Sequence, residues 1–241
     1  MPRRIGQILL SGGLDSTTLA CLARAETDEL LALTIDYGQR HAIELDAARK
    51  VAAVLGLHHR VLDVRAYGGL AAHSALTDTE LALPTGRRLE EMARGIPTTY
   101  VPLRNTFFLT LAAASLESRV LEAIETGGQA PEDIDPVLYI AANALDYSGY
   151  PDCRPEFYAA LTETLRLGSK IGTQYGRAIR IATPLIDKSK ADIVRLGTKL
   201  GAPLALSWSC YGAGPSPCGA CDSCLLRAKG FAEAGLQDPT L

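Results

Sequence analysis

Ser11-Gly12-Gly13-Leu14-Asp15-Ser16, continued by Thr17-Thr18, is the stretch that decides how this chain folds. The apolar run Ile8-Leu9-Leu10 precedes it and predicts the end of a buried strand, while residues 19–23 have the composition of a helix packed on a sheet. Two glycines at such a turn allow backbone N–H groups to converge on an anion at the start of the helix. The hydroxyls add hydrogen-bond donors, and Asp15 supplies a carboxylate for a phosphate-bound Mg²⁺.

Neither of the commoner phosphate loops is present in the sequence. The Walker A motif requires Gly-x-x-x-x-Gly-Lys before Ser or Thr, and the dinucleotide fingerprint requires Gly-x-Gly-x-x-Gly. The pattern Ser-Gly-Gly-x-Asp-Ser after a first strand resembles instead the PP-loop of the N-type ATP pyrophosphatases, which hold pyrophosphate and transfer AMP to an acyl or amide oxygen. An ordinary Gly-Gly turn between strand and helix is the alternative, and the placement and the hydroxyls disfavour it.

Length and charge narrow the class of protein. The 241 residues suffice for one α/β domain, alone or with an appendage, around a sizeable core. The formal net charge is −3 and no run of Lys and Arg stands out, so we do not expect a nucleic-acid partner. The sequence has no apolar stretch of about 18 residues and no signal-like start, which predicts a soluble, cytoplasmic protein without membrane contact.

Buried strands alternate with helices along the chain. After the first strand we expect strands at residues 30–35, 58–64, 137–142 and 179–183, and helices at residues 43–55, 105–124 and 189–200 and from Pro155 onward. Residues 65–100, rich in Gly, Thr and Pro, predict a long loop with a short helix at 89–94. The alternation predicts an α/β fold with a doubly wound, mostly parallel, Rossmann-like sheet.

Four of the six cysteines are crowded near the C-terminus, in the pattern Cys210-x₇-Cys218-x₂-Cys221-x₂-Cys224. Four thiolates complete the tetrahedral shell of Zn²⁺ and leave no open position, so this spacing predicts a structural rather than a catalytic metal site. An iron–sulfur cluster, and buried thiols or two disulfides, are the alternatives. The expected organisation is a domain at residues 1–203 followed by a small zinc-binding region at 204–241.

Polar residues follow the other strands, at the sheet edge where open α/β folds collect ligands. Residues 143–154 combine carboxylates, phenols, an amide and a guanidinium, the mixture that recognises a flat polar heterocycle, although turn chemistry alone is an equal alternative. Arg104 and Asn105 open the long helix and could face a phosphate or carboxylate, or simply solvent. Lys188 could neutralise a phosphate, although lone lysines are more often surface charges.

Taken together, these segments resemble the 7-cyano-7-deazaguanine synthases. The likeness runs nearly end to end and rests on residues 11–18, 37–41, 104–105, 143–157, 208–211, 218–224 and 235–240. Residues 143–154 and the four cysteines distinguish this family within the PP-loop superfamily. Ala141-Ala142 and Leu103 depart from the family pattern, at positions where smaller or different residues are expected.

The resemblance implies a fold like that of the adenine nucleotide alpha hydrolases and an ATP-dependent ligase. Such an enzyme converts 7-carboxy-7-deazaguanine and ammonia to the nitrile by successive adenylation of acid and amide, on the route to queuosine or archaeosine. It implies one structural Zn²⁺ per chain, ATP with Mg²⁺ as co-substrate, no nucleic-acid or membrane partner, and a homodimer.

The resemblance also implies roles for individual residues. The expected catalytic residues are Asp15, Ser16 and Lys188. The residues expected to hold ATP are Leu10, Ser11, Gly12, Gly13, Leu14, Asp15, Ser16, Thr17, Thr18, Gln39, Arg40 and Arg104. Those expected to bind the deazaguanine are Tyr100, Asn105, Asn143, Asp146, Tyr147, Tyr150 and Asp152. The expected metal ligands are Cys210, Cys218, Cys221 and Cys224.

Two functions of other classes remain as alternatives. A PP-loop tRNA thiolase would share the first motif, but it needs a reactive cysteine outside the metal set and a basic surface for RNA. A zinc-ribbon binding module with a vestigial nucleotide fold would bind without turnover. An assay with ATP, ammonia and 7-carboxy-7-deazaguanine that looks for a nitrile separates all three.

Overall fold

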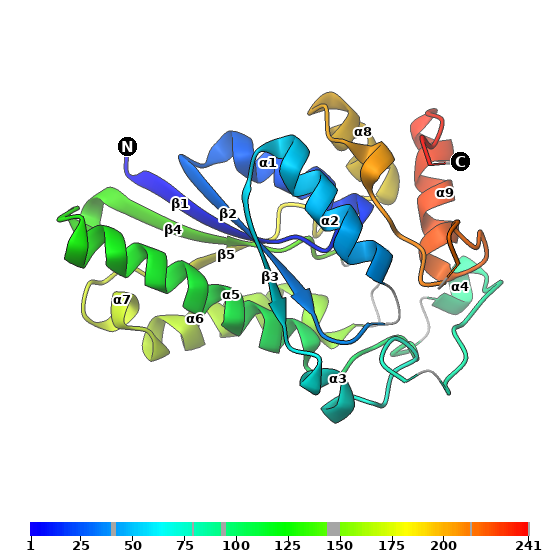
Figure 1. The fold of residues 1–241 in the computed structure, drawn as a ribbon, viewed down its shortest axis with the longest axis horizontal. Coiled ribbons are helices and arrows are strands. Elements are labelled where there is room, and N and C mark those ends of the chain that lie inside the picture. The colour runs from blue at the N-terminus through cyan, green and yellow to red at the C-terminus, as the bar shows by residue number, and fades with distance from the viewer. Residues whose placement is uncertain (40–41, 79, 93–94, 144–149, 213, 241) are drawn as a thin grey trace.

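The computed structural model describes residues 1–39, 42–78, 80–92, 95–143, 150–212 and 214–240. Three expected site residues, Arg40, Asp146 and Tyr147, lie outside the described residues. In the described part of the chain, five parallel strands form a sheet in the order β3-β2-β1-β4-β5, with helices on both faces (Figure 1). The expected doubly wound parallel sheet is confirmed.

The elements fall close to the expected positions. The strands are β1 (Arg3–Leu9), β2 (Glu29–Asp36), β3 (His58–Asp63), β4 (Ile134–Tyr139) and β5 (Arg180–Ala182). The helices are α1 (Leu14–Glu26), α2 (Ala42–Leu55), α3 (Ala66–Leu70), α4 (Leu89–Met92), α5 (Arg104–Leu121), α6 (Pro155–Gly168), α7 (Lys170–Thr173), α8 (Lys190–Lys199) and α9 (Asp222–Ala234). The fourth strand starts and ends three residues earlier than expected, and the fifth is shorter.

Two apolar cores sandwich the sheet because successive strand residues point to opposite faces. Ile8 and Val137 pack with α1, α2 and α8 on one face, whereas Ile5 and Leu138 pack with α5 and α6 on the other. Figure 1 shows the same two layers, with α5, α6 and α7 on the side of the sheet opposite α1 and α2. Burial on both faces explains why the inner strands β2 and β4 are nearly continuous apolar runs in the sequence.

The long segment between β3 and α5 contains two short helices, α3 and α4, and docks on the cysteine-rich region. Thr85 forms an antiparallel bridge with Cys221. Arg87 makes an ion pair with Asp222, whose side chain is only 3% exposed. The expected long loop is confirmed, with α3 as an addition; of the short helix expected at 89–94, α4 covers 89–92, and residues 93–94 lie outside the described residues.

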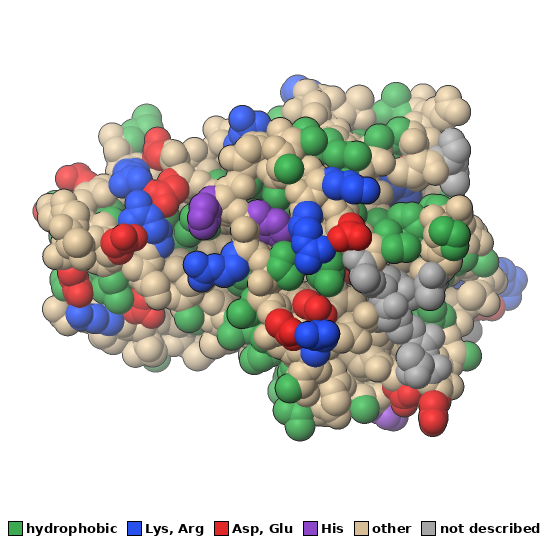
Figure 2. Space-filling view, in the orientation of Figure 1, with side chains coloured by type: hydrophobic (Ala, Val, Ile, Leu, Met, Phe, Trp, Pro, Cys, Tyr) green, Lys and Arg blue, Asp and Glu red, His purple; other side chains and the backbone are tan. Residues whose placement is uncertain are grey.

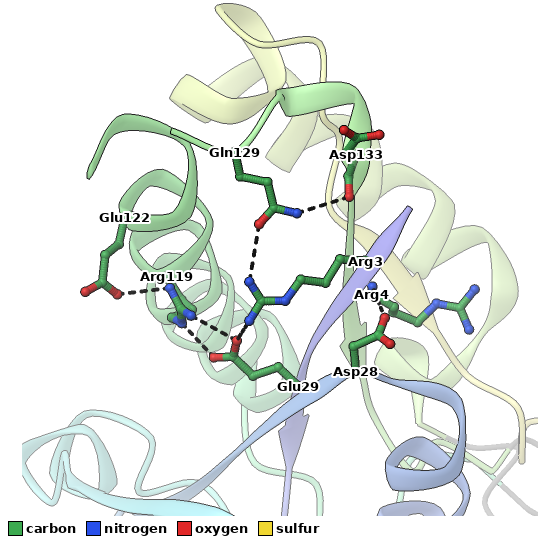
Figure 3. Close-up of polar contacts among 8 residues, drawn as sticks. All are labelled: Arg3, Arg4, Asp28, Glu29, Arg119, Glu122, Gln129 and Asp133. Atoms are coloured by element: carbon green, nitrogen blue, oxygen red, sulfur yellow. Dashed lines mark hydrogen bonds and ion pairs between the residues drawn. The ribbon is translucent and has the colours of Figure 1, made fainter. Parts of the chain in front are cut away.

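An ion-pair network ties the sheet together at the amino ends of the strands (Figure 3). Glu29 on β2 accepts from Arg3 of β1 at 2.6 Å and from Arg119 of α5 at 2.6 and 3.0 Å. Arg3 also bonds to Gln129, and Arg119 to Glu122. These side chains are partly exposed, so each pair contributes about 1 kcal/mol at most.

The surface carries both signs of charge. On the face drawn in Figure 2, basic and acidic side chains are interspersed, and neither kind gathers into one broad patch. Among the helices that the structure describes, none is both long enough and apolar enough to span a bilayer.

Candidate active site

A cavity of about 290 Å³ lies where the carboxyl ends of β1, β2 and β4 meet the first turns of α1 and α5. The expected site residues that line it are Leu10, Ser11, Gly13, Leu14, Asp15, Ser16, Gln39, Arg104, Asn105, Asn143 and Tyr150. Of the described residues expected to act in catalysis or to bind ATP or the deazaguanine, those that do not line the cavity are Gly12, Thr17, Thr18, Tyr100, Asp152 and Lys188. The cavity thus brings the PP-loop and the later polar segments to one place.

The PP-loop turn is shaped by the close approach of α2. Gly12 has φ +82°, and a Cβ on it would lie 2.5 Å from the carbonyl oxygen of Glu44, so only glycine fits. Ser11 Oγ donates to Ser16 Oγ at 3.0 Å, and Ser16 Oγ donates to the Gly13 carbonyl at 3.1 Å. Both hydroxyls line the cavity at the start of α1, where they and the free N–H groups of the first turn can bind phosphate.

Asp15 forms an ion pair with Lys190, the first residue of α8. Lys190 Nζ lies 2.9 and 2.7 Å from the two carboxylate oxygens, and the side chains are 9% and 20% exposed. The lysine that reaches the PP-loop is therefore Lys190. Lys188 lies outside the cavity lining, and its carbonyl accepts from Asn143 Nδ2 at 2.6 Å, so its backbone orients an amide that does line the cavity.

Thr17 and Thr18 point into the protein. Both are fully buried, and their hydroxyls have no hydrogen-bond partner among the described residues. A Cβ on Gly197 would lie 2.6 Å from Thr18 Oγ1, so this threonine packs α1 directly against α8. The two residues support the PP-loop helix from behind.

Arg104, Tyr37 and Glu44 form an electrostatic cluster on the cavity wall. Burial raises the pKa of Glu44 to about 7, and the positive charge of Arg104 opposes this rise. Burial also raises the pKa of the Tyr37 phenol. Burial disfavours the charged form of Arg104 as well. Electrostatic interactions with Tyr37, Tyr150 and Asp152 outweigh that cost and raise the pKa of Arg104. Arg104 is therefore a permanent cation in the cavity.

Leu103, directly before α5, has a left-handed backbone conformation. Its φ is +55°, the one positive value among the non-glycine residues that the structure describes, and its side chain is 65% exposed. Its N–H donates to Tyr100 Oη at 3.1 Å, which places Tyr100 behind the cavity as a support for this turn. The turn starts α5 with Arg104 facing the cavity, at a cost of about 1–2 kcal/mol in backbone strain. The departure of Leu103 from the family pattern thus falls where glycine would be unstrained.

Asn105 and Asp152 hold two segments of the site together. Asp152 is 6% exposed, and its Oδ2 accepts from the Asn105 N–H at 3.3 Å, while Asn105 Nδ2 donates to the Asp152 carbonyl at 3.2 Å. Tyr150 Oη lies 2.7 Å from Thr99 Oγ1. Asp152 therefore positions its neighbours in the wall rather than facing the cavity.

The four cysteines fit a tetrahedral metal ion. Their Sγ atoms all lie within 4.8 Å of one another, and none forms a disulfide. The N–H groups of Gly212 and Cys218 donate to Cys210 Sγ at 3.1 and 3.3 Å, as expected for a thiolate ligand. Metal–sulfur bonds of about 2.3 Å require sulfurs about 4 Å apart around one ion, whereas a cluster of several iron ions needs a wider set.

The segment that leads into the cysteines completes the cavity, although no motif in the sequence predicts this contact. The Trp208 N–H donates to the Gly12 carbonyl at 2.8 Å, and its indole N–H donates to the Cys210 carbonyl at 3.0 Å. Trp208, Ser209 and Tyr211 all line the cavity. The segment before the four cysteines therefore braces the PP-loop through one backbone hydrogen bond. No local signal marks this contact, because Gly12 and Trp208 lie far apart in the sequence.

The cysteines outside the metal set are poor nucleophiles. Burial raises the pKa of Cys153 to about 11, and the nearby Asp152 adds to the effect. Burial also raises the pKa of Cys21. Thiols with raised pKa values carry little thiolate at neutral pH, which disfavours the thiolase alternative.

The fold and the cavity define a PP-loop nucleotide-binding protein with a cluster of four cysteines that can hold a metal ion. The family model for "Queuosine biosynthesis protein QueC" matches residues 7–235, and the chain belongs to this family. The 7-cyano-7-deazaguanine synthase of Trichodesmium erythraeum is 49% identical over 97% of this chain and 98% of its own. That of Anaeromyxobacter dehalogenans is 49% identical over 97% of this chain and 93% of its own. The NMN synthetase of Francisella tularensis is a distant structural neighbour, with 18% identity, TM-score 0.41, and coverage of 98% of this chain and 79% of that one.

Proposed function

We propose that this chain is an ATP-dependent ligase that converts 7-carboxy-7-deazaguanine and ammonia to 7-cyano-7-deazaguanine. The observation that supports it is the shared cavity, in which a PP-loop faces Arg104, Asn105, Asn143 and Tyr150. Adenylation of an oxygen turns it into a good leaving group, so the residues need mainly to position the reactants and stabilise charge. The relatives in this family are named for the formation of 7-cyano-7-deazaguanine, and the arrangement of the cavity residues suits that reaction.

The residues of the PP-loop have distinct roles in this proposal. Ser11, Gly13 and Ser16 hold the pyrophosphate part of ATP with hydroxyl and backbone N–H groups. Asp15 is the carboxylate available to the Mg²⁺ that accompanies ATP. When no Mg²⁺ is bound, the ion pair with Lys190 balances the charge of Asp15. Lys190 is also the lysine whose position suits a phosphate, in place of the role expected for Lys188. Arg104 and Gln39, which also line the cavity, complete the anion site.

Within this proposal, Zn²⁺ is the metal of the four cysteines, and its role is structural. A closed set of four thiolates has no position for substrate. The region at residues 204–241 acts as an appendage that completes the cavity of the domain at 1–203. A cytoplasmic location, a homodimer and the absence of a nucleic-acid partner stay predictions.

The stoichiometry of the reaction tests the proposal. A nitrile forms from an acid by loss of both carboxyl oxygens, and one PP-loop can activate them in turn through an amide intermediate. We expect two AMP and two pyrophosphate per nitrile, and we expect the synthetic amide to be converted with one ATP. Chromatography and mass spectrometry measure nitrile, AMP and pyrophosphate together. Formation of only ADP and phosphate, or failure to use the amide, would contradict the mechanism, and no nitrile at all would contradict the function.

A further inference from the structure

Glu44 is a carboxylate of the cavity that nothing in the proposed reaction has yet used. It lies in the first turn of α2, directly behind the PP-loop, and its backbone carbonyl is the atom that requires glycine at position 12. Its side chain is partly exposed, and it lines the cavity. No ion pair or hydrogen bond joins this carboxylate to another residue that the structure describes. It is therefore available to a ligand.

The reaction creates a demand for such a group. Ammonium brings four hydrogens, and the nitrile nitrogen keeps none. One proton leaves to give ammonia, and a second leaves as the C–N bond forms and the first AMP departs with a carboxyl oxygen. The last two leave as the C≡N bond forms and the second AMP departs with the amide oxygen. The electron pair of each broken C–O bond leaves on AMP, so no oxidant or reductant is needed.

Few other groups of the cavity can accept those protons. Of its described lining residues, Asp15 and Glu44 are the carboxylates, and Asp15 is paired with Lys190. None of the described lining residues is a histidine. The Cys153 thiol and the Tyr37 phenol have pKa values raised by burial, so they hold their own protons at neutral pH.

We propose that Glu44 is the general base that takes protons from the reacting nitrogen, both in amide formation and in the elimination that gives the nitrile. This inference rests on the proposed function. Among the residues that the structure describes, the charged and titratable groups that face Glu44 are Arg104 from the start of α5 and Tyr37, directly after β2. Arg104 keeps the carboxylate from being fully neutralised, and burial keeps it basic enough to accept a proton near pH 7. Its partial exposure gives the proton a way to solvent.

Partial reactions separate this role from a merely structural one. Exchange of labelled pyrophosphate into ATP, with the acid present and ammonia absent, reports on the first adenylation, which removes no proton from nitrogen. Amide formation from the acid, and nitrile formation from the synthetic amide, both require a base. Glu44→Gln keeps the shape and removes the base, Glu44→Asp retains a carboxylate, and Asp46→Asn is the matched control. Asp46 lies on the same helix, is 63% exposed and pairs with Arg49.

In Glu44→Gln we expect amide and nitrile formation to slow by roughly 100- to 10,000-fold, while pyrophosphate exchange stays within a few-fold of wild type. Glu44→Asp should recover part of both rates, and Asp46→Asn should match wild type. The wild-type rate of amide-to-nitrile conversion should rise with pH to a plateau, with a midpoint near 7, and Glu44→Gln should lack this rise.

Two results would overturn the inference. One is an equal loss of exchange and of both nitrogen steps in Glu44→Gln, which would make Glu44 a residue that holds ATP or the acid. The other is normal turnover in that variant, or no rise with pH near neutrality in the wild type, a measurement that does not depend on the folding of any variant. Wild-type nitrile synthesis is measured first, so a failure of the proposed function is recognised separately.

Discussion

Replacing Glu44 with glutamine should make the protein more stable while making it less active. An ionised carboxylate in the cavity wall is costly, and glutamine has nearly the same shape without the charge. The pKa of Glu44 rises from its ordinary value of 4.5 to about 7 on folding. At about 1.4 kcal/mol for each pH unit of difference, the ionised side chain destabilises the folded protein by about 3 kcal/mol.

The pH dependence fixes the sign of this effect. Below pH 4.5 the carboxyl is protonated in both the folded and the unfolded chain, and no penalty exists. Between pH 4.5 and 7 the folded chain binds the proton that the unfolded chain has lost, so the stability of the wild type falls as pH rises. Above pH 7 the penalty is complete. The gain from Glu44→Gln should therefore be about 2–3 kcal/mol at pH 8 and about 1 kcal/mol or less at pH 5.

Urea unfolding of the metal-loaded protein without nucleotide, followed by circular dichroism between pH 5 and 8.5, measures this difference. Asp46→Asn, an exposed change on the same helix, should show no comparable gain. A Glu44→Gln variant that is equally stable at pH 8, or whose advantage grows as the pH falls, would refute the reasoning. Either outcome would mean that the folded protein does not disfavour the ionised form of Glu44.

Three further substitutions test the rest of the site. Asp15→Ala should abolish nitrile formation and lower the free energy of unfolding, since it removes the carboxylate that pairs with the nearly buried Lys190; retained turnover would exclude Asp15 from the mechanism. Cys221→Ser should lose about one equivalent of zinc by elemental analysis and lower the melting temperature, so full zinc in a stable variant contradicts that assignment. Leu103→Gly should raise stability by about 0.5–1 kcal/mol in urea titrations, because it relieves the positive φ, and a loss of stability would show that the turn is unstrained.

The sequence predicts the sheet because its strands, and the helices that cover both of its faces, have recognisable local patterns of apolar residues. The inner strands β1, β2 and β4 are buried on both faces and contain short apolar runs, and the apolar residues of the helices recur with helical spacing. The PP-loop is equally local, since Gly12 and Ser16 are recognised from six consecutive residues. The inward orientation of the Thr17 and Thr18 side chains is also predictable from the sequence. Both residues share a helical face with Leu14 and Cys21, at spacings of three, four and seven residues.

The rest of the site depends on contacts between distant segments. Lys188 and Lys190 both follow a strand, and only the start of α8 at Lys190, after the cap at Ser189, decides which of them reaches Asp15. Glu44 looks like any exposed acid in the first turn of an amphipathic helix until Tyr37 and Arg104 close around it. A single sequence without tertiary contacts does not separate these possibilities.

The bond between Trp208 and Gly12 has a consequence for synthesis on the ribosome. The PP-loop at Gly12 is made well before Trp208 and the other late residues that brace it and close its cavity. At about 5–20 residues per second, the loop waits roughly 10–40 seconds for the partner that holds its carbonyl in place. A nascent chain therefore emerges with its phosphate loop but without the finished wall of the site. Such a chain should not consume ATP until the cysteine-rich segment has folded onto it.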